Sequence, residues 1–315
     1  MTAIAFVTLF GYFVLKLGWI EALLLAPMTA GTSSVVIIPL VSKLNLNDEV
    51  GITLSLESTV TDVLNIVLVI TFLQMYVSGL VSAVQVASTI VTRFAVGALL
   101  GFVLGLIWIK VLGLTRKQEF TYMLTIAALI LCYVASETLG GSGSLSALLF
   151  GLVLGNYSEI YNVFSKKTNL DYMPESKSNL KHIQGELSFL IRAFFFVFLG
   201  LVYLPQILGI LFAAVIMATN LVFRYAAVTI STFKSKMFEY RMFMTLMCGT
   251  GLANAALSVL VYNTLTTQGN PAPQAYLYPL VVSNIIIINN IITSIAPVIW
   301  GTKQKQRAPK VNAEA

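Results

Sequence analysis

A strip of oxygen-bearing side chains runs along an apolar segment, residues 49–78. Ser58, Asp62 and Asn65 are spaced at i, i+4 and i+7, so a hydroxyl, a carboxylate and an amide share one helical face. Glu57 and Thr61 form the adjacent row. Hard cations take oxygen ligands, so the strip suits Na⁺ or K⁺. A polar seam between helices is the alternative, but mutual hydrogen bonding in such a seam rarely needs an acid.

Two other apolar segments carry glycine and proline patterns typical of interrupted spans. The first holds Pro27, the run Gly31-Thr32-Ser33-Ser34 and Pro39, and the second holds Cys248-Gly249-Thr250-Gly251-Leu252-Ala253-Asn254. Close packing of small residues would explain either pattern alone. Paired interruptions in the two halves of a chain instead indicate the binding site of an inverted-repeat transporter. The candidates here are Thr32 and Ser33 in the first segment, and Gly249, Thr250, Gly251 and Asn254 in the second.

The composition indicates that these segments lie in a lipid bilayer rather than in water. Of 315 residues, 57% are apolar and 10% are charged, whereas a soluble domain carries about 25% charged residues. The apolar residues form long blocks rather than the short alternating segments of a membrane barrel. The sequence therefore predicts an all-α polytopic membrane protein of about ten helices. The expected spans are 2–17, 19–43, 49–78, 84–112, 118–138, 143–165, 178–203, 205–232, 238–263 and 276–300.

Basic residues fall in every second loop between these spans. They lie at 43, 110–117, 166–181, 234–241 and 303–310, whereas only Lys16 lies on the opposite side. By the positive-inside rule the basic loops and both termini are expected in the cytoplasm, with the chain in the cell membrane. The net charge of +6 is then a topology signal, which argues against nucleic acid as a partner. His182 has no Cys or His neighbour at ligand spacing, so no transition metal and no other cofactor is expected.

Five charged residues are expected inside spans: Glu57, Asp62, Arg93, Arg192 and Arg224. Placing a charge in mid-bilayer costs about 2.5–3.5 kcal/mol on insertion scales, so such residues usually pair or line a pathway.

The order of these motifs resembles the monovalent cation:proton antiporter superfamily, in particular prokaryotic Na⁺/H⁺ antiporters, over residues 20–300. Gly31 to Pro39 looks like the first crossing helix of that family, and Glu57-Ser58 with Thr61-Asp62 looks like its Glu-Ser…Asn-Asp motif. Arg224 is similar to the arginine that bridges the motif's glutamate. Gly140 to Leu145, Gly151 to Asn156 and Phe195 to Gly200 also fit.

The resemblance implies a role for each candidate. Asp62 would take either a cation or a proton, with Ser58, Thr32, Ser33 and Thr61 around it, and Glu57 and Arg224 would form a structural ion pair. It further implies an ion-binding core at 19–78 and 205–300 within a domain of residues 1–302, a cytoplasmic tail at 303–315, and a homodimer. Family members usually have about three further helices ahead of this point, so the chain is expected to be either naturally short at its N-terminus or a fragment.

Three positions depart from the family pattern. Ser33 stands where many relatives have an aspartate, Thr61 replaces an asparagine or a second aspartate, and Thr250 stands where many have an arginine. A serine-rich first crossing helix is similar to the branch that contains potassium efflux proteins. K⁺ is therefore an alternative to Na⁺.

The expected function is exchange of Na⁺ or K⁺ for protons by alternating access. A cation channel or uniporter would use the same oxygen strip but conduct without proton counterflow, and a sensor derived from this fold would bind ions without flux. An enzyme is not expected, because no Ser/His or Gly-x-Ser-x-Gly arrangement lies within a span.

Overall fold

A computed structural model describes residues 2–41, 44, 46–79, 83–114, 121–157, 173–203, 205–267 and 274–307. Within these ranges all regular secondary structure is helical, as expected. The first half of the chain contains α1 (Thr2–Phe13), α2 (Trp19–Ala30), α3 (Ser34–Val41), α4 (Asp48–Ser78), α5 (Ala83–Leu114), α6 (Thr121–Thr138) and α7 (Gly143–Gly155). The second half contains α9 (Met173–Val202), α10 (Ile207–Ser231), the 3₁₀ helix η1 (Lys236–Tyr240), α11 (Arg241–Leu246), α12 (Leu252–Thr267) and α13 (Leu277–Arg307).

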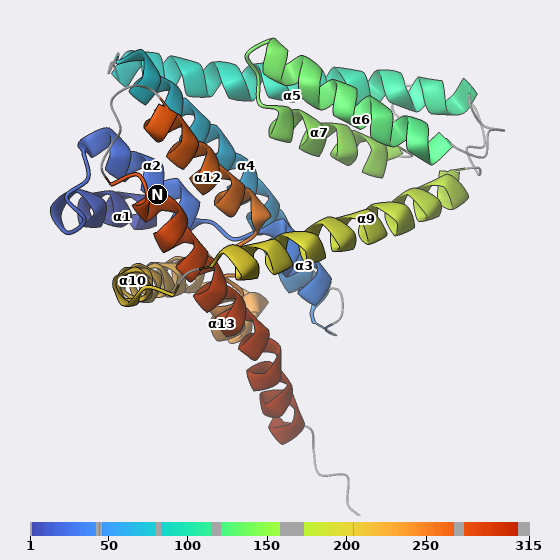
Figure 1. The fold of residues 1–315 in the computed structure, drawn as a ribbon. Helices are drawn as coiled ribbons and strands as arrows, with labels where there is room; N and C mark the ends of the chain where they lie inside the picture. Colours follow the sequence, from blue (N-terminus) through green and yellow to red (C-terminus); the bar gives the residue numbers. More distant parts are fainter. Residues whose placement is uncertain are drawn as a thin grey trace, which may run out of the picture. The chain divides into compact units, whose positions relative to one another are not determined.

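The chain divides into two compact units. Unit 1 comprises Met1–Gly79 and Phe196–Ala315, and unit 2 comprises Leu80–Phe195. In unit 1, α12 packs against both α2 and α4, and α10 packs against α13 (Figure 1). In unit 2, α5, α6 and α7 pack against one another. Both halves of the site described below belong to unit 1.

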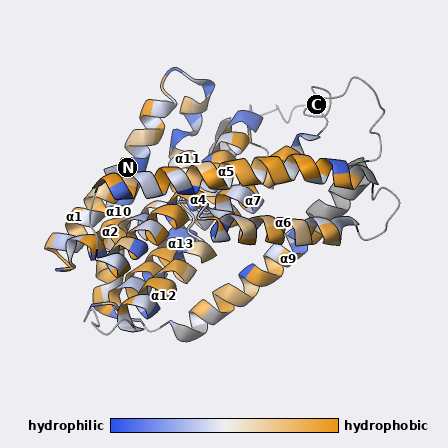
Figure 2. Ribbon diagram, turned by 90° about the horizontal axis from the view of Figure 1, so that it is seen from above, coloured by the Kyte–Doolittle hydropathy of each residue, from blue (hydrophilic) through white to orange (hydrophobic). Residues whose placement is uncertain are grey.

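Long apolar helices recur along the chain, as the hydropathy colouring of Figure 2 shows. Among the described residues, six segments are long and apolar enough to cross a membrane: Trp19–Val41, Asp48–Ser78, Val84–Leu112, Thr121–Thr138, Ile207–Ser231 and Leu277–Trp300. Large apolar side chains such as Leu99, Leu131 and Ile230 are exposed on them. Faces of this kind suit lipid rather than water, so the chain is a multi-pass membrane protein. Several basic positions used for the topology, including Lys43, Arg116, Lys117, Lys166, Lys167 and Lys310, lie outside the described residues.

Both glycine-containing segments interrupt their helices. Helix α2 stops at Ala30, residues 31–33 are non-helical, and α3 begins at Ser34. The backbone of Gly31 is extended, with φ −96° and ψ 154°. The expected span 238–263 has three pieces, because η1 precedes the short α11 and residues 247–251 are non-helical before α12 begins.

Glycines bring α5 and α7 of unit 2 into close contact. A Cβ atom on Gly101 would lie 2.3 Å from the Ser146 carbonyl oxygen, and one on Gly97 would lie 2.7 Å from the Ser142 carbonyl oxygen. The Ser142 amide also donates to the Arg93 carbonyl at 2.9 Å. The Arg93 side chain, which is buried, pairs with Glu137 at 3.7 Å. The intramembrane charge of Arg93 therefore has a partner within its own unit.

An apolar cluster in unit 1 is built from α3, α4, α10, α11 and α13, together with the residue that follows α11. Its members are all buried: Ile37, Val41, Val50, Leu54, Val228, Phe243, Met244, Met247 and Ala296. Trp300 and Tyr240 pack against it, with their ring centroids 4.7 Å apart. The cluster packs Ile37 and Val41 of α3 against α11, the helix that precedes α12.

Candidate ion-binding site

Asp62 meets the start of α3. Its Oδ2 atom accepts a hydrogen bond from the backbone amide of Ser34 at 2.9 Å, and another from the Ser34 hydroxyl at 2.9 Å. The Ser33 hydroxyl donates to the same atom at 3.3 Å. The first amides of a helix have no partner within it, and the interruption before Ser34 leaves one of them for the carboxylate. Within the described residues, every donor that reaches Asp62 bonds Oδ2, which leaves Oδ1 to bind something else.

The residue before Asp62 holds the interrupted segment against α4. Thr61 Oγ1 donates to the Thr32 carbonyl at 3.1 Å and lies 3.3 Å from Thr32 Oγ1. The same hydroxyl lies 2.8 Å from the Glu57 carbonyl in its own helix. A bond to residue i−4 is typical of threonine in an apolar helix, so the single Thr61 proton serves one carbonyl or the other, while the Thr32 hydroxyl can donate to Thr61 Oγ1. Thr61 and Asp62 thus fix consecutive residues of the first interruption.

The two interruptions meet through the main chain. The Ser33 amide donates to the Gly249 carbonyl at 2.8 Å. A Cβ atom on Gly251 would lie 2.2 Å from Ser33 Oγ, and one on Gly249 would lie 2.6 Å from Val36 Cγ1. Only glycine fits such an approach. The two glycines predicted from the sequence therefore allow the close contact between the segments.

Amides from α13 hold the second interruption. Asn289 Nδ2 donates to the Thr250 hydroxyl at 2.5 Å, and Asn290 Nδ2 donates to the Thr250 carbonyl at 3.1 Å. Asn254, in the first turn of α12, is only 1% exposed, and its side chain has no hydrogen-bond partner among the described residues. The surroundings of Thr250 are thus polar and uncharged.

Glu57 and Arg224 join α4 to α10. Arg224 Nη1 and Nη2 donate to the two Glu57 carboxylate oxygens at 2.5 and 3.0 Å. Arg224 also donates to the carbonyls of Met244 and Met247, at the end of α11. The two charged side chains are 15% and 33% exposed. A bidentate pair with two further carbonyl acceptors is what a buried guanidinium requires.

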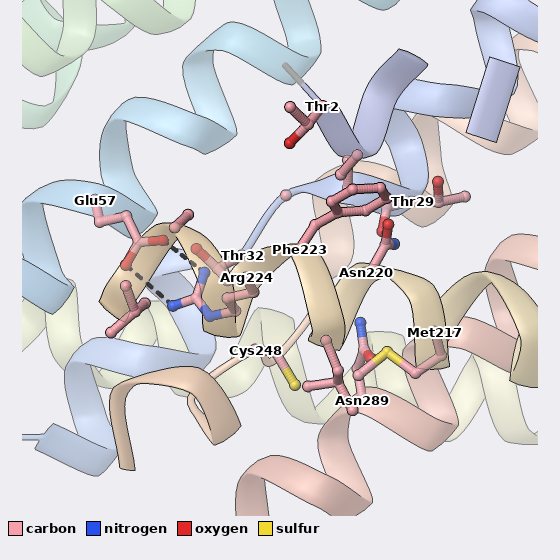
Figure 3. Close-up of a pocket in the computed structure, with 16 residues that line it drawn as sticks. Thr2, Thr29, Thr32, Glu57, Met217, Asn220, Phe223, Arg224, Cys248 and Asn289 are labelled. Carbon is pink, nitrogen blue, oxygen red and sulfur yellow. Dashed lines mark hydrogen bonds and ion pairs between the residues drawn. The ribbon is translucent and has the colours of Figure 1, made fainter. Parts of the chain in front are cut away.

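A cavity of about 210 Å³ lies beside this ion pair. Figure 3 shows Thr32, Glu57 and Arg224 on its wall, with Asn220 from α10 and Asn289 from α13. The Asn220 Nδ2 atom donates to the Thr29 carbonyl at 2.9 Å. The cavity thus adjoins the first interruption.

The structure brings most of the predicted residues together, but Ser58 is an exception. Its hydroxyl donates to the Ser55 carbonyl at 3.0 Å, within its own helix, rather than to Asp62. Sequence reasoning missed Ser34, although it lies in the predicted interruption, and also Asn220, Asn289 and Asn290. The spacing of Asn289 and Thr293 at i, i+4 was an available signal for a polar face on α13.

An oxygen-rich site between interrupted helices, inside an apolar helical protein, is the arrangement of a membrane transporter rather than an enzyme. The profile of the transmembrane sodium/hydrogen exchanger family matches residues 1–300, and the chain belongs to that family. The resemblance inferred from the sequence is thereby confirmed.

Individual relatives carry both cation specificities in their names. The chain is 27% identical to Na(+)/H(+) antiporter 1 of Methanocaldococcus jannaschii over 290 residues, which are 88% of this chain and 65% of that antiporter. It is 32% identical to the K(+)/H(+) antiporter NhaP2 of Shewanella sp. (strain MR-4) over 143 residues, which are 44% of this chain and 25% of that antiporter. The matched part is less than two thirds of either relative.

A solved structure supports the fold. The sodium proton antiporter MjNhaP1 from Methanocaldococcus jannaschii, determined at pH 8, superposes with a TM-score of 0.70 and 24% sequence identity. The match covers 99% of this chain and 76% of that structure's chain. The helical arrangement is therefore the one found in that antiporter.

Proposed function

We propose that the chain exchanges a monovalent cation, Na⁺ or K⁺, for protons, and that Asp62 binds both in turn. The observation that carries the proposal is the environment of this carboxylate at the junction of the two interruptions. Ser33 and Ser34 fix its Oδ2 atom, while Oδ1 has no donor among the described residues. A cation or a proton would bind at Oδ1.

Competition follows from the charge of the group. A carboxylate removed from water is unfavourable unless a positive charge neutralises it, and either a metal ion or a proton does so. The two ions would therefore exclude each other at Asp62. Exchange would need no separate gate for each ion, because the empty, charged carboxylate is the state least suited to cross the bilayer.

The neighbouring oxygens would complete the coordination of a cation. The hydroxyls of Ser33 and Ser34 lie at hydrogen-bond distance from Asp62, and a hydroxyl can turn to offer a lone pair instead of its proton. Thr32 precedes Ser33 in the chain, and its hydroxyl lies 3.3 Å from that of Thr61, the residue before Asp62. Ser58 would contribute only if its hydroxyl left the Ser55 carbonyl.

Transport would proceed by alternating access in a bundle of about ten spans built as inverted repeats. Residues 1–302 would form the membrane domain, with the ion-binding core at 19–78 and 205–300. Residues 303–315 would form a tail, and both termini would lie in the cytoplasm. Glu57 and Arg224 would keep α4 and α10 together during the movement. The transporting unit would be a homodimer.

The names of the relatives support both cations, since one is called an Na(+)/H(+) antiporter and the other a K(+)/H(+) antiporter. Ser33 leaves Asp62 without a second acid beside it in the first interruption. A site with a single carboxylate and several hydroxyls makes K⁺ a substrate to test alongside Na⁺.

The test is proton movement in proteoliposomes that contain a pH-sensitive dye, with Na⁺, K⁺ or Li⁺ added outside an acidic lumen. We expect cation-dependent alkalinisation with the parent chain and none with Asp62→Asn. Asp48→Asn is the matched control, because it makes the same change in the exposed first turn of the same helix. Full exchange by Asp62→Asn would overturn the proposal. Cation flux without proton counterflow would indicate a channel, and cation binding without flux would indicate a sensor.

A further inference from the structure

The Gly249-Thr250-Gly251 run carries only one side chain beyond hydrogen. Both glycines face the first interruption, because a Cβ atom on Gly251 would lie 2.2 Å from Ser33 Oγ and one on Gly249 would lie 2.6 Å from Val36 Cγ1. The run is non-helical, and glycine is the residue with the greatest backbone freedom. Its conformation therefore depends on contacts that other elements make with it.

Helix α13 makes such contacts at Thr250. Asn290 Nδ2 donates to the Thr250 carbonyl at 3.1 Å, and Asn289 Nδ2 donates to the Thr250 hydroxyl. The Asn290 Oδ1 atom lies 3.3 Å from the position of a Cβ on Gly249, so the same amide also packs against that glycine. Thr250 is fully buried and Asn289 is only 3% exposed, so water does not compete for these bonds. The two asparagines, called here the α13 clamp, hold both the backbone and the side chain of Thr250.

The same face of α13 reaches the start of the second interruption. One turn after Asn289, the Thr293 hydroxyl donates to the Leu246 carbonyl at 3.3 Å and lies 3.8 Å from Cys248 Sγ. Thr293 is fully buried. Helix α13 therefore follows the interruption from the last residue of α11 to Thr250.

The clamp is connected to Asp62 through two hydrogen bonds. The Gly249 carbonyl, which belongs to the peptide group that joins Gly249 to Thr250, accepts from the Ser33 amide at 2.8 Å. The Ser33 hydroxyl donates to Asp62 Oδ2 at 3.3 Å, and the next residue, Ser34, donates to the same atom. A rotation of the Gly249 peptide group would break the first bond and displace Ser33. The position of the donors around Asp62 thus depends on how Thr250 is held.

We propose that Asn289 and Asn290 are positioning residues for the cation site at Asp62, although neither bonds Asp62 itself. The proposal rests on the proposed function in taking Asp62 as the carboxylate that binds the cation. Asn289 acts through the Thr250 side chain, whereas Asn290 acts through the Thr250 backbone.

The first measurement is the cation concentration for half-maximal exchange in proteoliposomes. We expect Asn289→Leu and Asn290→Leu each to raise this concentration about fivefold, because each removes one buried donor from Thr250. Asn263→Leu is the matched control, because it makes the same change at an exposed position of α12. A loss of folded protein lowers the maximal rate and leaves the half-maximal concentration unchanged, so this concentration separates positioning from folding.

Thr250→Val distinguishes the two routes. It removes the hydroxyl that Asn289 binds but keeps the carbonyl that Asn290 binds. In the Thr250→Val chain, Asn289→Leu should therefore change the half-maximal concentration little further, since both partners of one hydrogen bond are then apolar. Asn290→Leu should still raise it about fivefold.

The two native cysteines report on the clamp without any transport. Cys248 lies within the second interruption and Cys132 lies in unit 2, and the two are 6% and 1% exposed. The rate at which N-ethylmaleimide modifies each thiol in the purified full chain is measured by peptide mass spectrometry. We expect Asn290→Leu to speed the modification of Cys248 severalfold and to leave Cys132 unchanged. General unfolding would expose both thiols.

Three results would overturn the proposal. The first is a half-maximal concentration that neither Asn289→Leu nor Asn290→Leu changes, and the second is an equal rise in Asn263→Leu. The third is a Cys248 that reacts no faster in Asn290→Leu than in the parent. If Asn290→Leu fails to insert, Asn290→Ala removes the same donor without adding apolar volume and is held to the same outcomes.

Failure of this proposal and failure of the proposed function give different results. Exchange that depends on Asp62 but is insensitive to both asparagines removes the clamp and leaves the antiporter. A parent chain that binds Na⁺ or K⁺ at Asp62 in detergent without exchanging it removes the antiporter. Calorimetric titration of that binding should then show the same fivefold weakening in the two clamp variants.

Discussion

The backbone amide of Ser33 donates a hydrogen bond to the backbone carbonyl of Gly249 at 2.8 Å. This bond joins two segments that are more than 200 residues apart in the sequence. Each partner is free to make it because neither lies in a helix. The Ser33 side chain is then directed to Asp62, at 3.3 Å. One residue therefore links the two interruptions to the carboxylate.

Gly251→Ala should disturb this junction. Its new methyl group would lie 2.2 Å from Ser33 Oγ and 2.7 Å from Ser33 Cβ, so the two segments must separate. We expect the free energy of unfolding in detergent to fall by about 1–3 kcal/mol, as for other overpacked sites, and exchange to fall with it. Adding Ser33→Gly removes both clashing atoms and should restore part of the stability. A Gly251→Ala variant that melts like the parent would contradict the close approach.

Ser34→Ala and Ser58→Ala should differ, although both remove one hydroxyl near Asp62. The Ser34 hydroxyl bonds Asp62 at 2.9 Å, whereas the Ser58 hydroxyl bonds the Ser55 carbonyl. We expect Ser34→Ala to raise the cation concentration for half-maximal exchange by roughly tenfold, since an oxygen next to the bound charge is lost. Ser58→Ala should change it little. Proteoliposome titrations with Na⁺ and K⁺ measure both, and a larger effect at Ser58 would contradict the geometry.

Arg224→Ala should be strongly destabilising, because it leaves the Glu57 carboxylate and two backbone carbonyls without their donor. Breaking one side of a buried pair costs about 3–5 kcal/mol, and the exposure of Glu57 places this pair at or below the lower end. Removing both partners, in Glu57→Ala with Arg224→Ala, should cost less than the sum of the single changes. Thermal unfolding of all four proteins in detergent gives the coupling, and strict additivity would mean that the pair is not formed.

Two glycines of unit 2 provide a matched comparison. Gly101→Ala would place a methyl group 2.3 Å from the Ser146 carbonyl oxygen and push α5 away from α7, whereas a Cβ on Gly151 meets nothing within 4 Å. We expect Gly101→Ala to lower the melting temperature by several degrees. Gly151→Ala should leave it unchanged or raise it, because alanine favours an exposed helical position. The order of the two melting temperatures decides whether the α5 and α7 contact is as close as described.

The interruptions were predictable because they depend on local backbone chemistry. Gly31 marks the first, and Gly249 and Gly251 mark the second, whereas Pro27 and Pro39 lie inside α2 and α3 and interrupt neither helix. The pieces around the second were less predictable. The span expected at 238–263 instead begins within η1 and continues as the six-residue α11, the non-helical residues 247–251 and α12. Helical periodicity does not specify such short pieces.

The spacing of polar residues predicted which face of α4 belongs to the candidate site. Spacing placed Ser58 and Asp62 on one face of α4, but it does not specify whether a hydroxyl turns outward or bonds its own helix. The involvement of Asn220 and Asn289 could not be predicted from the sequence, for another reason. Each is an isolated amide in an apolar span, and only the packing of α10 and α13 shows that the two line one cavity.

The apolar cluster around Val41, Val50 and Phe243 has a consequence for the proposed exchange. Its members come from five helices and are all buried, so the cluster does not depend on any single side chain. Turning one rotamer would not open a path, because the neighbours would still be in contact. A hydrated ion can pass there only if whole helices move apart and the cluster is wetted. Under the proposed exchange, any barrier at this cluster would be a property of the packing between helices, and its height should respond to the volume of the side chains more than to their individual positions.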